Sequence, residues 1–115
     1  MANSLFGMHG DALELRGRRM TLIASNIANA ATPGYKARDL DFAAALAARE
    51  AGEGDAASAD GALRYRVPTM DSLDGNTVEM ATEQTAFAEN ALAYATTLEF
   101  LKGRIETVTR AIRGE

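Results

Sequence analysis

The C-terminal third of the chain carries the pattern that most restricts the fold. From Phe87 onward, apolar residues recur at alternating spacings of four and three positions over more than three heptads. Such a repeat places its members along one side of an α-helix, where a second helix can pack against them. We therefore expect a helix over 76–113, ended by Gly114, with a packing or subunit interface formed by the following residues: Phe87, Tyr94, Leu98, Leu101, Ile105, Val108 and Ile112.

The start of this helix has its own signals. Asn76 is a good N-cap residue, and Glu79 follows three positions later in the arrangement of a capping box. Acidic residues then lie in the early turns and arginines in the late turns, as the helix dipole favours. The pattern predicts that the helix begins at Asn76.

A second apolar repeat occupies the N-terminal segment 5–31. Its main stripe includes Leu13, Met20 and Ile27, and these three residues are expected to pack against the C-terminal helix. The fold class we expect is therefore mainly α, with the two terminal helices paired as an antiparallel coiled-coil hairpin and a small extended or β segment in an irregular middle.

Further apolar rows lie beside both main stripes. On the N-terminal helix the row consists of Met8, Leu15 and Leu22, and on the C-terminal helix it consists of Ala88, Leu92 and Ala95. A two-helix hairpin buries one stripe of each helix, so we expect these rows to serve contacts between subunits. The alternative is that they form ordinary core contacts within one subunit.

The N-terminal helix ends at a firm stop. Thr32, Pro33 and Gly34 combine a proline, which disfavours helical backbone in the preceding residue, with a glycine suited to a helix exit. Asn26 and Asn29 lie three positions apart on the last turns, although asparagine is a mediocre helix former. We expect their amides to satisfy backbone groups of the chain leaving the helix or of a neighbouring subunit, or only to cap the helix locally.

The middle of the chain, 32–75, loses this periodicity. Asp41 is suited to cap a short helix that runs to Leu46. Residues 50–61 are small, acidic and poor in apolar side chains, which is typical of a mobile loop. The alternation at 63–67 predicts a short extended segment or edge strand before Pro68.

Composition limits the possible functions. The 115 residues suffice for a single domain, and a net charge of −4 disfavours a nucleic-acid partner. No stretch approaches the ~18 consecutive apolar residues of a membrane span, and the N-terminus lacks the features of a cleaved secretory signal. We therefore expect export, if it occurs, by a route without a cleaved signal peptide.

We find no pattern of catalytic or metal-binding residues. The single histidine, His9, lies between glycines and has no evident partner to orient it. The acidic residues near Glu53 lack the spacing of a calcium loop, and the chain has no cysteine. We expect no enzyme activity, no cofactor, no metal and no small-molecule substrate.

Two motifs give the chain a family resemblance. The segment that contains Asn26, Asn29, Thr32, Gly34 and Tyr35 resembles the N-terminal signature of bacterial flagellar axial proteins. The segments 36–42, 75–79 and 87–94 are similar to those of the proximal rod subunits in that family. The resemblance implies a structural subunit of the basal-body rod, a drive shaft in the periplasm that encloses the export channel.

The resemblance also implies partners. These are further copies of the chain, the rod proteins FlgC and FlgF, the adaptor FliE and the flagellar export gate, reached by type III export. Two alternatives remain open: another rod or hook-junction subunit, and a soluble helical adaptor that binds a partner helix.

Overall fold

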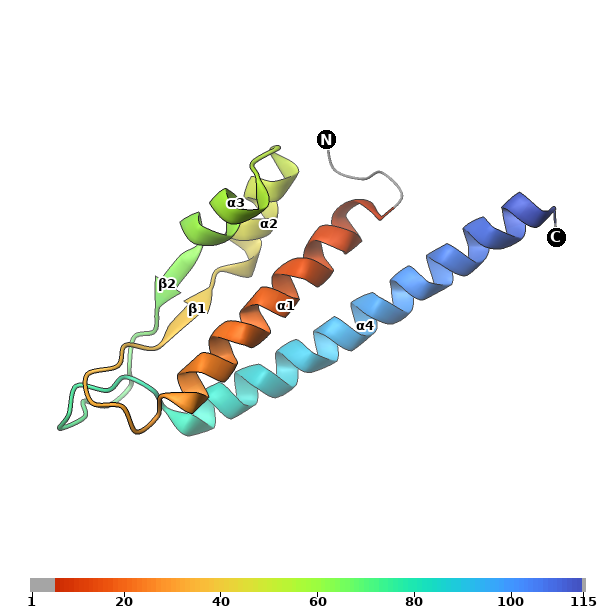
Figure 1. The fold of residues 1–115 in the computed structure, drawn as a ribbon. Coiled ribbons are helices and arrows are strands. Elements are labelled where there is room, and N and C mark those ends of the chain that lie inside the picture. Colours follow the sequence, from red (N-terminus) through yellow and green to blue (C-terminus); the bar gives the residue numbers. More distant parts are fainter. Residues whose placement is uncertain (1–5, 115) are drawn as a thin grey trace.

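The computed structural model describes residues 6–114 and consists mainly of helices (Figure 1). Two long helices, α1 and α4, lie at the ends of the described chain, and a two-stranded sheet and two short helices lie between them. The elements in chain order are α1 (Gly7–Ala28), β1 (Arg38–Leu40), α2 (Phe42–Glu50), α3 (Asp55–Gly61), β2 (Leu63–Tyr65) and α4 (Met80–Arg113).

Helix α1 is the central layer of the molecule. Helix α4 runs antiparallel along one side of α1, whereas β1, β2, α2 and α3 lie along the other side (Figure 1). The result is an elongated molecule of 64 × 26 × 18 Å. The expected hairpin of terminal helices is confirmed, and α4 continues well past the first turn of α1 (Figure 1).

The position of α1 between two layers explains its additional apolar row. Leu15 is completely buried in a cluster with Leu40, Ala45 and Ala62, and Leu22 packs against the same cluster. The expectation that this row contacts other subunits is therefore wrong for Leu15 and Leu22, whereas Met8 is half-exposed. Full burial of one leucine contributes about 1.5–3 kcal/mol, so the row stabilises the subunit itself.

The middle of the chain is more regular than the sequence predicts. The Asp41 carboxylate accepts the Ala44 amide at 3.1 Å and caps α2, as predicted. Strand β2 forms where an extended segment was expected and pairs antiparallel with β1, with Leu40 opposite Leu63. The predicted loop over 50–61 is wrong in part, because residues 55–61 form α3, whose Ala59 is buried. Contact with the rest of the subunit allows a segment of low hydrophobicity to become helical.

The ends of the long helices also differ from expectation. Helix α1 ends at Ala28, three positions earlier than predicted, and turns follow. Helix α4 begins at Met80 with Glu79 in the cap position, so the prediction that Asn76 caps it is wrong. Gly114 ends α4 with a left-handed φ of 77°, as its predicted role requires.

Candidate functional site

The candidate site is a polar junction at the end of α1, and Asn26 lies at its centre. The Asn26 side chain has no exposed surface. Its Nδ2 donates to the Arg38 carbonyl at 2.7 Å and to Glu83 Oε1 at 2.9 Å. Its Oδ1 accepts from the Arg38 amide at 3.1 Å and from the Tyr35 hydroxyl at 3.2 Å. Because an amide has two donor hydrogens and two acceptor lone pairs, every hydrogen-bonding position of Asn26 is filled.

A chain of ion pairs extends the junction from α4 to α1. Arg66 donates from Nε to Glu83 Oε2 at 2.6 Å and lies 3.0 Å from Asp39 through Nη2. Arg19 in turn holds Asp39 with two hydrogen bonds, at 2.8 and 3.0 Å. The hydrogen bond to Asp39 raises the pKa of Arg19 above its ordinary value. The network thus connects both long helices through Asp39 of β1 and Arg66, which follows β2.

Glu83 is the most demanding member of this network, because its carboxylate is completely buried. A buried charge is tolerated only when it is paired and hydrogen-bonded. Arg66 supplies the opposite charge, and Asn26 supplies a further donor. Loss of either partner is therefore expected to destabilise the pairing of α4 with the remainder of the subunit.

Asn29 has a different role from Asn26. Its Nδ2 donates to the Ser25 carbonyl at 2.8 Å, and its Oδ1 accepts from the Thr32 hydroxyl at 3.0 Å. Both partners lie within four positions, so Asn29 closes the end of α1 locally. The two amides, equivalent in the sequence pattern, are separated by the structure into a long-range connection and a local cap.

Asn76 joins the two sequence motifs. Its Nδ2 lies within 3.0 Å of three carbonyl oxygens, those of Asn29, Ala30 and Thr32. These carbonyls follow α1, so Asn76 caps the end of α1 and not the start of α4. Its Oδ1 also accepts the Val78 amide at 2.7 Å, which fixes the turn from which it projects.

The chain segments around these motifs lie side by side. The Gly34 amide donates to the Asp74 carbonyl at 2.8 Å, and the Thr77 amide donates to the Tyr35 carbonyl at 2.9 Å. Gly34 and Gly75 both have left-handed backbone, with φ of 75° and 77°. A side chain is strained in that conformation, which accounts for glycine at both turns. The N-terminal motif and the segment before α4 therefore form one structural unit.

The predicted packing residues divide into covered and exposed groups. Leu13, Met20, Ile27, Tyr94 and Val108 are half-buried, and Leu101 is 6% exposed. Four residues on the α4 stripe remain at least 40% exposed: Phe87, Leu98, Ile105 and Ile112. Coverage by α1 is thus incomplete along the predicted stripe.

The sequence reasoning missed two polar residues in the helix interface. Asn90 is 1% exposed and donates to the Arg16 carbonyl at 2.8 Å, and Glu83 lies seven positions earlier. A spacing of seven keeps both on the side of α4 that faces α1. Polar residues at heptad spacing beside an apolar stripe were the available signal. Asp39 and Arg66 had no comparable signal, since their pairing depends on the sheet.

The hydrogen bonds and ion pairs of the site join segments of this chain to one another. Among the described residues, no cluster of histidine or acidic side chains is arranged to hold a metal ion. None of the described helices is sufficiently long and apolar to span a membrane. The junction positions the two helices, the sheet and the intervening turns, which is a mechanical role.

The chain is an elongated hairpin of terminal helices with a polar junction at its closed end. This architecture is that of a helical structural subunit. Residues 8–36 match the model of a family described as flagella basal body rod protein. A flagellar basal body rod protein FlgB of Cereibacter sphaeroides is 51% identical, with 95% of this chain and 94% of that protein covered. The FlgB proteins of Aeromonas hydrophila and Escherichia coli are 41% and 39% identical, covering 96% and 90% of this chain and 93% and 88% of their own lengths.

The chain belongs to the FlgB family of flagellar basal body rod proteins. It is a structural subunit of the flagellar rod, and the resemblance seen in the two sequence motifs is confirmed.

Proposed function

We propose that this chain assembles with copies of itself through its terminal helices to form the proximal part of the rod, which transmits torque and encloses the export channel. The observation that supports self-assembly is the exposed apolar row on α4. Leu98 and Ile105 are 40% and 45% exposed, and Ile112 is 80% exposed. Apolar rows of this kind mark interaction surfaces.

The row continues an interface that already exists within the subunit. Leu101 is buried on the helix that packs along α1, and Ile105 and Ile112 follow it along the same side of α4. Helix α4 extends past α1 at this end (Figure 1). A second helix laid along the extension would complete the heptad packing that α1 begins.

The wider assembly is proposed from the family. FlgC, FlgF, FliE and the export gate are the expected neighbours, and the rod crosses the periplasm after export without a cleaved signal peptide. The proposal includes no catalysis, no nucleic acid and no small-molecule substrate. The axial-protein signature, Asn26 to Tyr35, would then hold each subunit in the shape that the rod requires.

The test removes the apolar row without disturbing the junction. Ile105→Asn combined with Ile112→Asn should abolish motility and leave basal bodies without rods, in a strain whose own copy of the gene is deleted. Thr85→Asn, at an exposed position of the same helix, is the control and should restore motility like the unmodified chain. Normal rods with the double variant at normal protein levels would contradict assembly through this row.

A further inference from the structure

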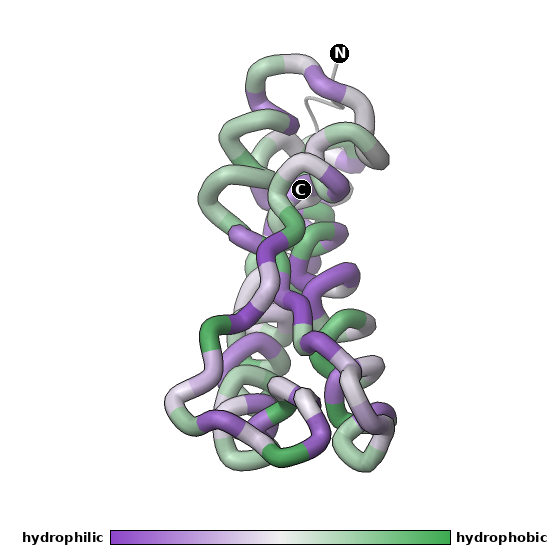
Figure 2. Tube along the Cα trace, turned by 90° about the vertical axis from the view of Figure 1, so that its left-hand side faces the viewer, coloured by the Kyte–Doolittle hydropathy of each residue, from purple (hydrophilic) through white to green (hydrophobic). Residues whose placement is uncertain are grey.

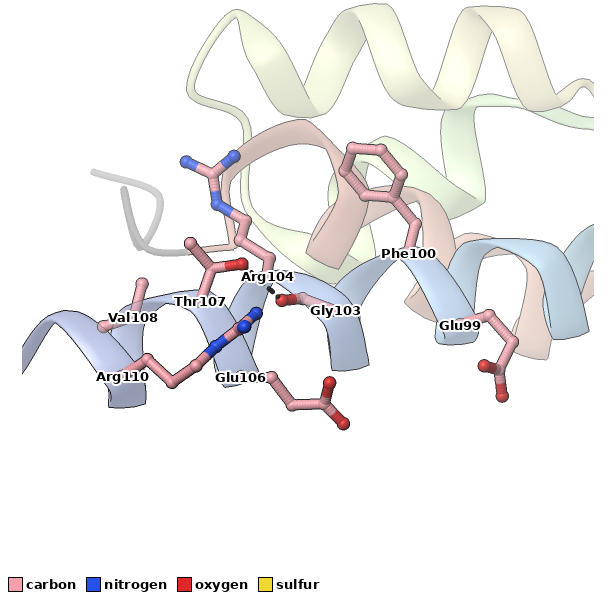
Figure 3. Close-up of a pocket in the computed structure, with 8 residues that line it drawn as sticks. All are labelled: Glu99, Phe100, Gly103, Arg104, Glu106, Thr107, Val108 and Arg110. Carbon is pink, nitrogen blue, oxygen red and sulfur yellow. Dashed lines mark hydrogen bonds between the residues drawn. The ribbon is translucent and has the colours of Figure 1, made fainter. Parts of the chain in front are cut away.

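A hollow on α4 lies at the level where α1 begins. Side chains from residues 99–110 line its volume of about 730 Å³, and we call it the α4 hollow (Figure 3). In Figure 3 the side chains of Phe100, Arg104 and Thr107 project from the upper side of α4, where the other helices lie. The first turn of α1 therefore stops beside a surface on which a longer α1 would rest.

The charges of the α4 hollow balance. Its lining contains two arginines, Arg104 and Arg110, and two glutamates, Glu99 and Glu106. Charge therefore gives a charged partner no advantage over an uncharged one. The tube in Figure 2 shows hydrophobic and hydrophilic residues mixed along the described chain, so hydropathy does not identify a partner either. The register of the two long helices does identify one.

Two side-chain contacts define the register of α1 against α4. Asn26 donates to Glu83 at 2.9 Å near one end of the pair, and the rings of His9 and Phe100 lie 4.3 Å apart near the other. The two contacts are 17 positions apart on each helix, so the antiparallel register is constant between them. Each position before His9 on α1 therefore corresponds to one position after Phe100 on α4.

The five residues before Phe6 suit the α4 hollow in length and chemistry. If residues 1–5 continued α1, they would come level with 104–108, and none of them has a charged side chain. Ala2 and Leu5 lie seven and four positions before His9. A continuous helix would therefore place both apolar side chains on the face that His9 presents to α4.

The described start of α1 is bent, and two glycines permit the bend. Gly7 has a left-handed φ of 55°, which turns the chain out of the path of a right-handed helix. A Cβ built on Gly10 would lie only 2.8 Å from the Cβ of Phe6. In a continuous helix, Cβ atoms four positions apart are separated by about 5–6 Å, so neither position would require glycine.

We propose that residues 1–5 continue α1 as a helix along the α4 hollow of the same chain, with Ala2 and Leu5 against it. Gly7 and Gly10 form the joint between this closed start and the bent one. The hollow is thus the docking site of the chain's own N-terminal segment, and closure extends the pairing of α1 with α4 by more than one turn.

The contact goes beyond the proposed assembly and does not compete with it. Phe100 precedes Ile105 by five positions, which places the two side chains about 140° apart around α4. The exposed row that contains Ile105 and Ile112 therefore remains available to another copy when the hollow is covered.

Introduced cysteines test the contact within one chain, because the chain has none of its own. Ala2→Cys combined with Thr107→Cys, at the same level in the register, should form an intramolecular disulfide when the dilute purified chain is oxidised. The matched control is Ala2→Cys with Glu106→Cys, whose side chain projects from the other side of α4 (Figure 3). The first pair should react at least about tenfold faster, as measured by mass spectrometry.

Alanine at the two glycines tests the joint. Gly7→Ala and Gly10→Ala, added to the first cysteine pair, disfavour the bent start and fit a continuous helix. The disulfide should then form about fivefold faster, and the Cα chemical shift of Leu5 should move to a helical value. Gly17→Ala, which stabilises α1 away from the joint, is the control and should leave the rate unchanged.

Three results would overturn the proposal. They are equal rates in the two cysteine pairs, disulfides that form only between chains, and a slower reaction when the two alanines are present. None of these measurements requires a rod, so the proposed function is judged separately by the motility of cells that carry the variants of the exposed α4 row.

Discussion

The side-chain amide of Asn26 lies 2.9 Å from the carboxylate of Glu83, and neither side chain has any exposed surface. The two residues are separated by 57 positions in the chain. Their hydrogen bond connects the last turns of α1 with the first turn of α4. Because both also bind residues around the sheet, one buried contact determines how three parts of the subunit are placed.

Replacement of Asn26 tests this connection. Asn26→Ala should lower the free energy of unfolding by about 4 kcal/mol, because it leaves the Arg38 backbone and Glu83 without their buried partner. Asn29→Ala is the matched control and should cost about 1 kcal/mol, since only local hydrogen bonds are lost. Urea denaturation of the purified chain, followed by far-ultraviolet circular dichroism, measures both. Equal losses would contradict the division of roles.

The buried charge of Glu83 predicts a strong effect at Arg66. Arg66→Ala should destabilise the subunit by about 3 kcal/mol, because a buried carboxylate is left without its cation. Arg64→Ala, at an exposed position on β2, should change stability by less than about 0.5 kcal/mol. In a double-mutant cycle, Glu83→Gln should reduce the cost of Arg66→Ala. Strict additivity of the two changes would show that the pair is not coupled.

Asn76 should stabilise the turns that follow α1, although it lies 47 positions after Asn29 in the chain. Asn76→Ala should cost about 2 kcal/mol and speed hydrogen exchange at the amides of Gly34 and Thr77, which bond across the same turns. The control is Asp41→Ala, which removes the cap of α2 at a cost of about 1 kcal/mol. It should leave exchange at Gly34 unchanged. If hydrogen exchange at Gly34 and Thr77 is unchanged in the Asn76 variant, Asn76 does not stabilise the turns that follow α1.

A carboxylate beside the junction predicts a pH effect. The Thr69 hydroxyl donates to Glu79 at 2.6 Å and lowers the pKa of Glu79 below its ordinary value, with further backbone donors from Thr69 and Met70. The hydrogen bonds to the ionised Glu79 carboxylate therefore stabilise the fold above the pKa that Glu79 has in the unfolded chain. This contribution is lost as the pH falls through the lowered pKa of Glu79 in the folded chain.

Thr69→Val should raise the folded pKa of Glu79 toward its ordinary value. A nuclear magnetic resonance titration of the Glu79 carboxyl measures this directly. Ser72→Ala is the control, because the Ser72 hydroxyl donates to the Asn76 carbonyl and leaves Glu79 untouched. An unchanged titration of Glu79 in the Thr69 variant would show that the hydroxyl does not stabilise the charge.

Two glycines should respond to alanine in opposite directions. Gly34→Ala places a side chain at a φ of 75° and should cost about 1 kcal/mol despite the open space around it. Gly17→Ala lies inside α1, where the new Cβ would be 3.8 Å from Tyr94, an ordinary contact. It should raise stability by about 0.5–1 kcal/mol. Thermal unfolding of both variants checks the sign of each change.

The site was predictable to the extent that it depends on neighbours in the chain. The stop at 32–34 and the two asparagines were recognisable because helix exits need particular residues within one or two turns. The sequence offered no means to tell that Asn26 reaches Glu83 while Asn29 remains local. For Asn76, a strong local capping pattern led to the wrong partner, since carbonyls after α1 compete for the same amide.

The sequence by itself determined that two long helices lie toward the ends of the chain, because heptad spacing is a property of one segment and its own backbone. It also determined that helix α1 must stop near Pro33. Only the tertiary structure decided which neighbour covers each row: β1, α2 and Ala62 after α3 lie against α1 and bury Leu15, whereas the end of α4 keeps Ile112 exposed. Periodicity specifies that a face is apolar, but burial depends on which distant segment comes to lie against it.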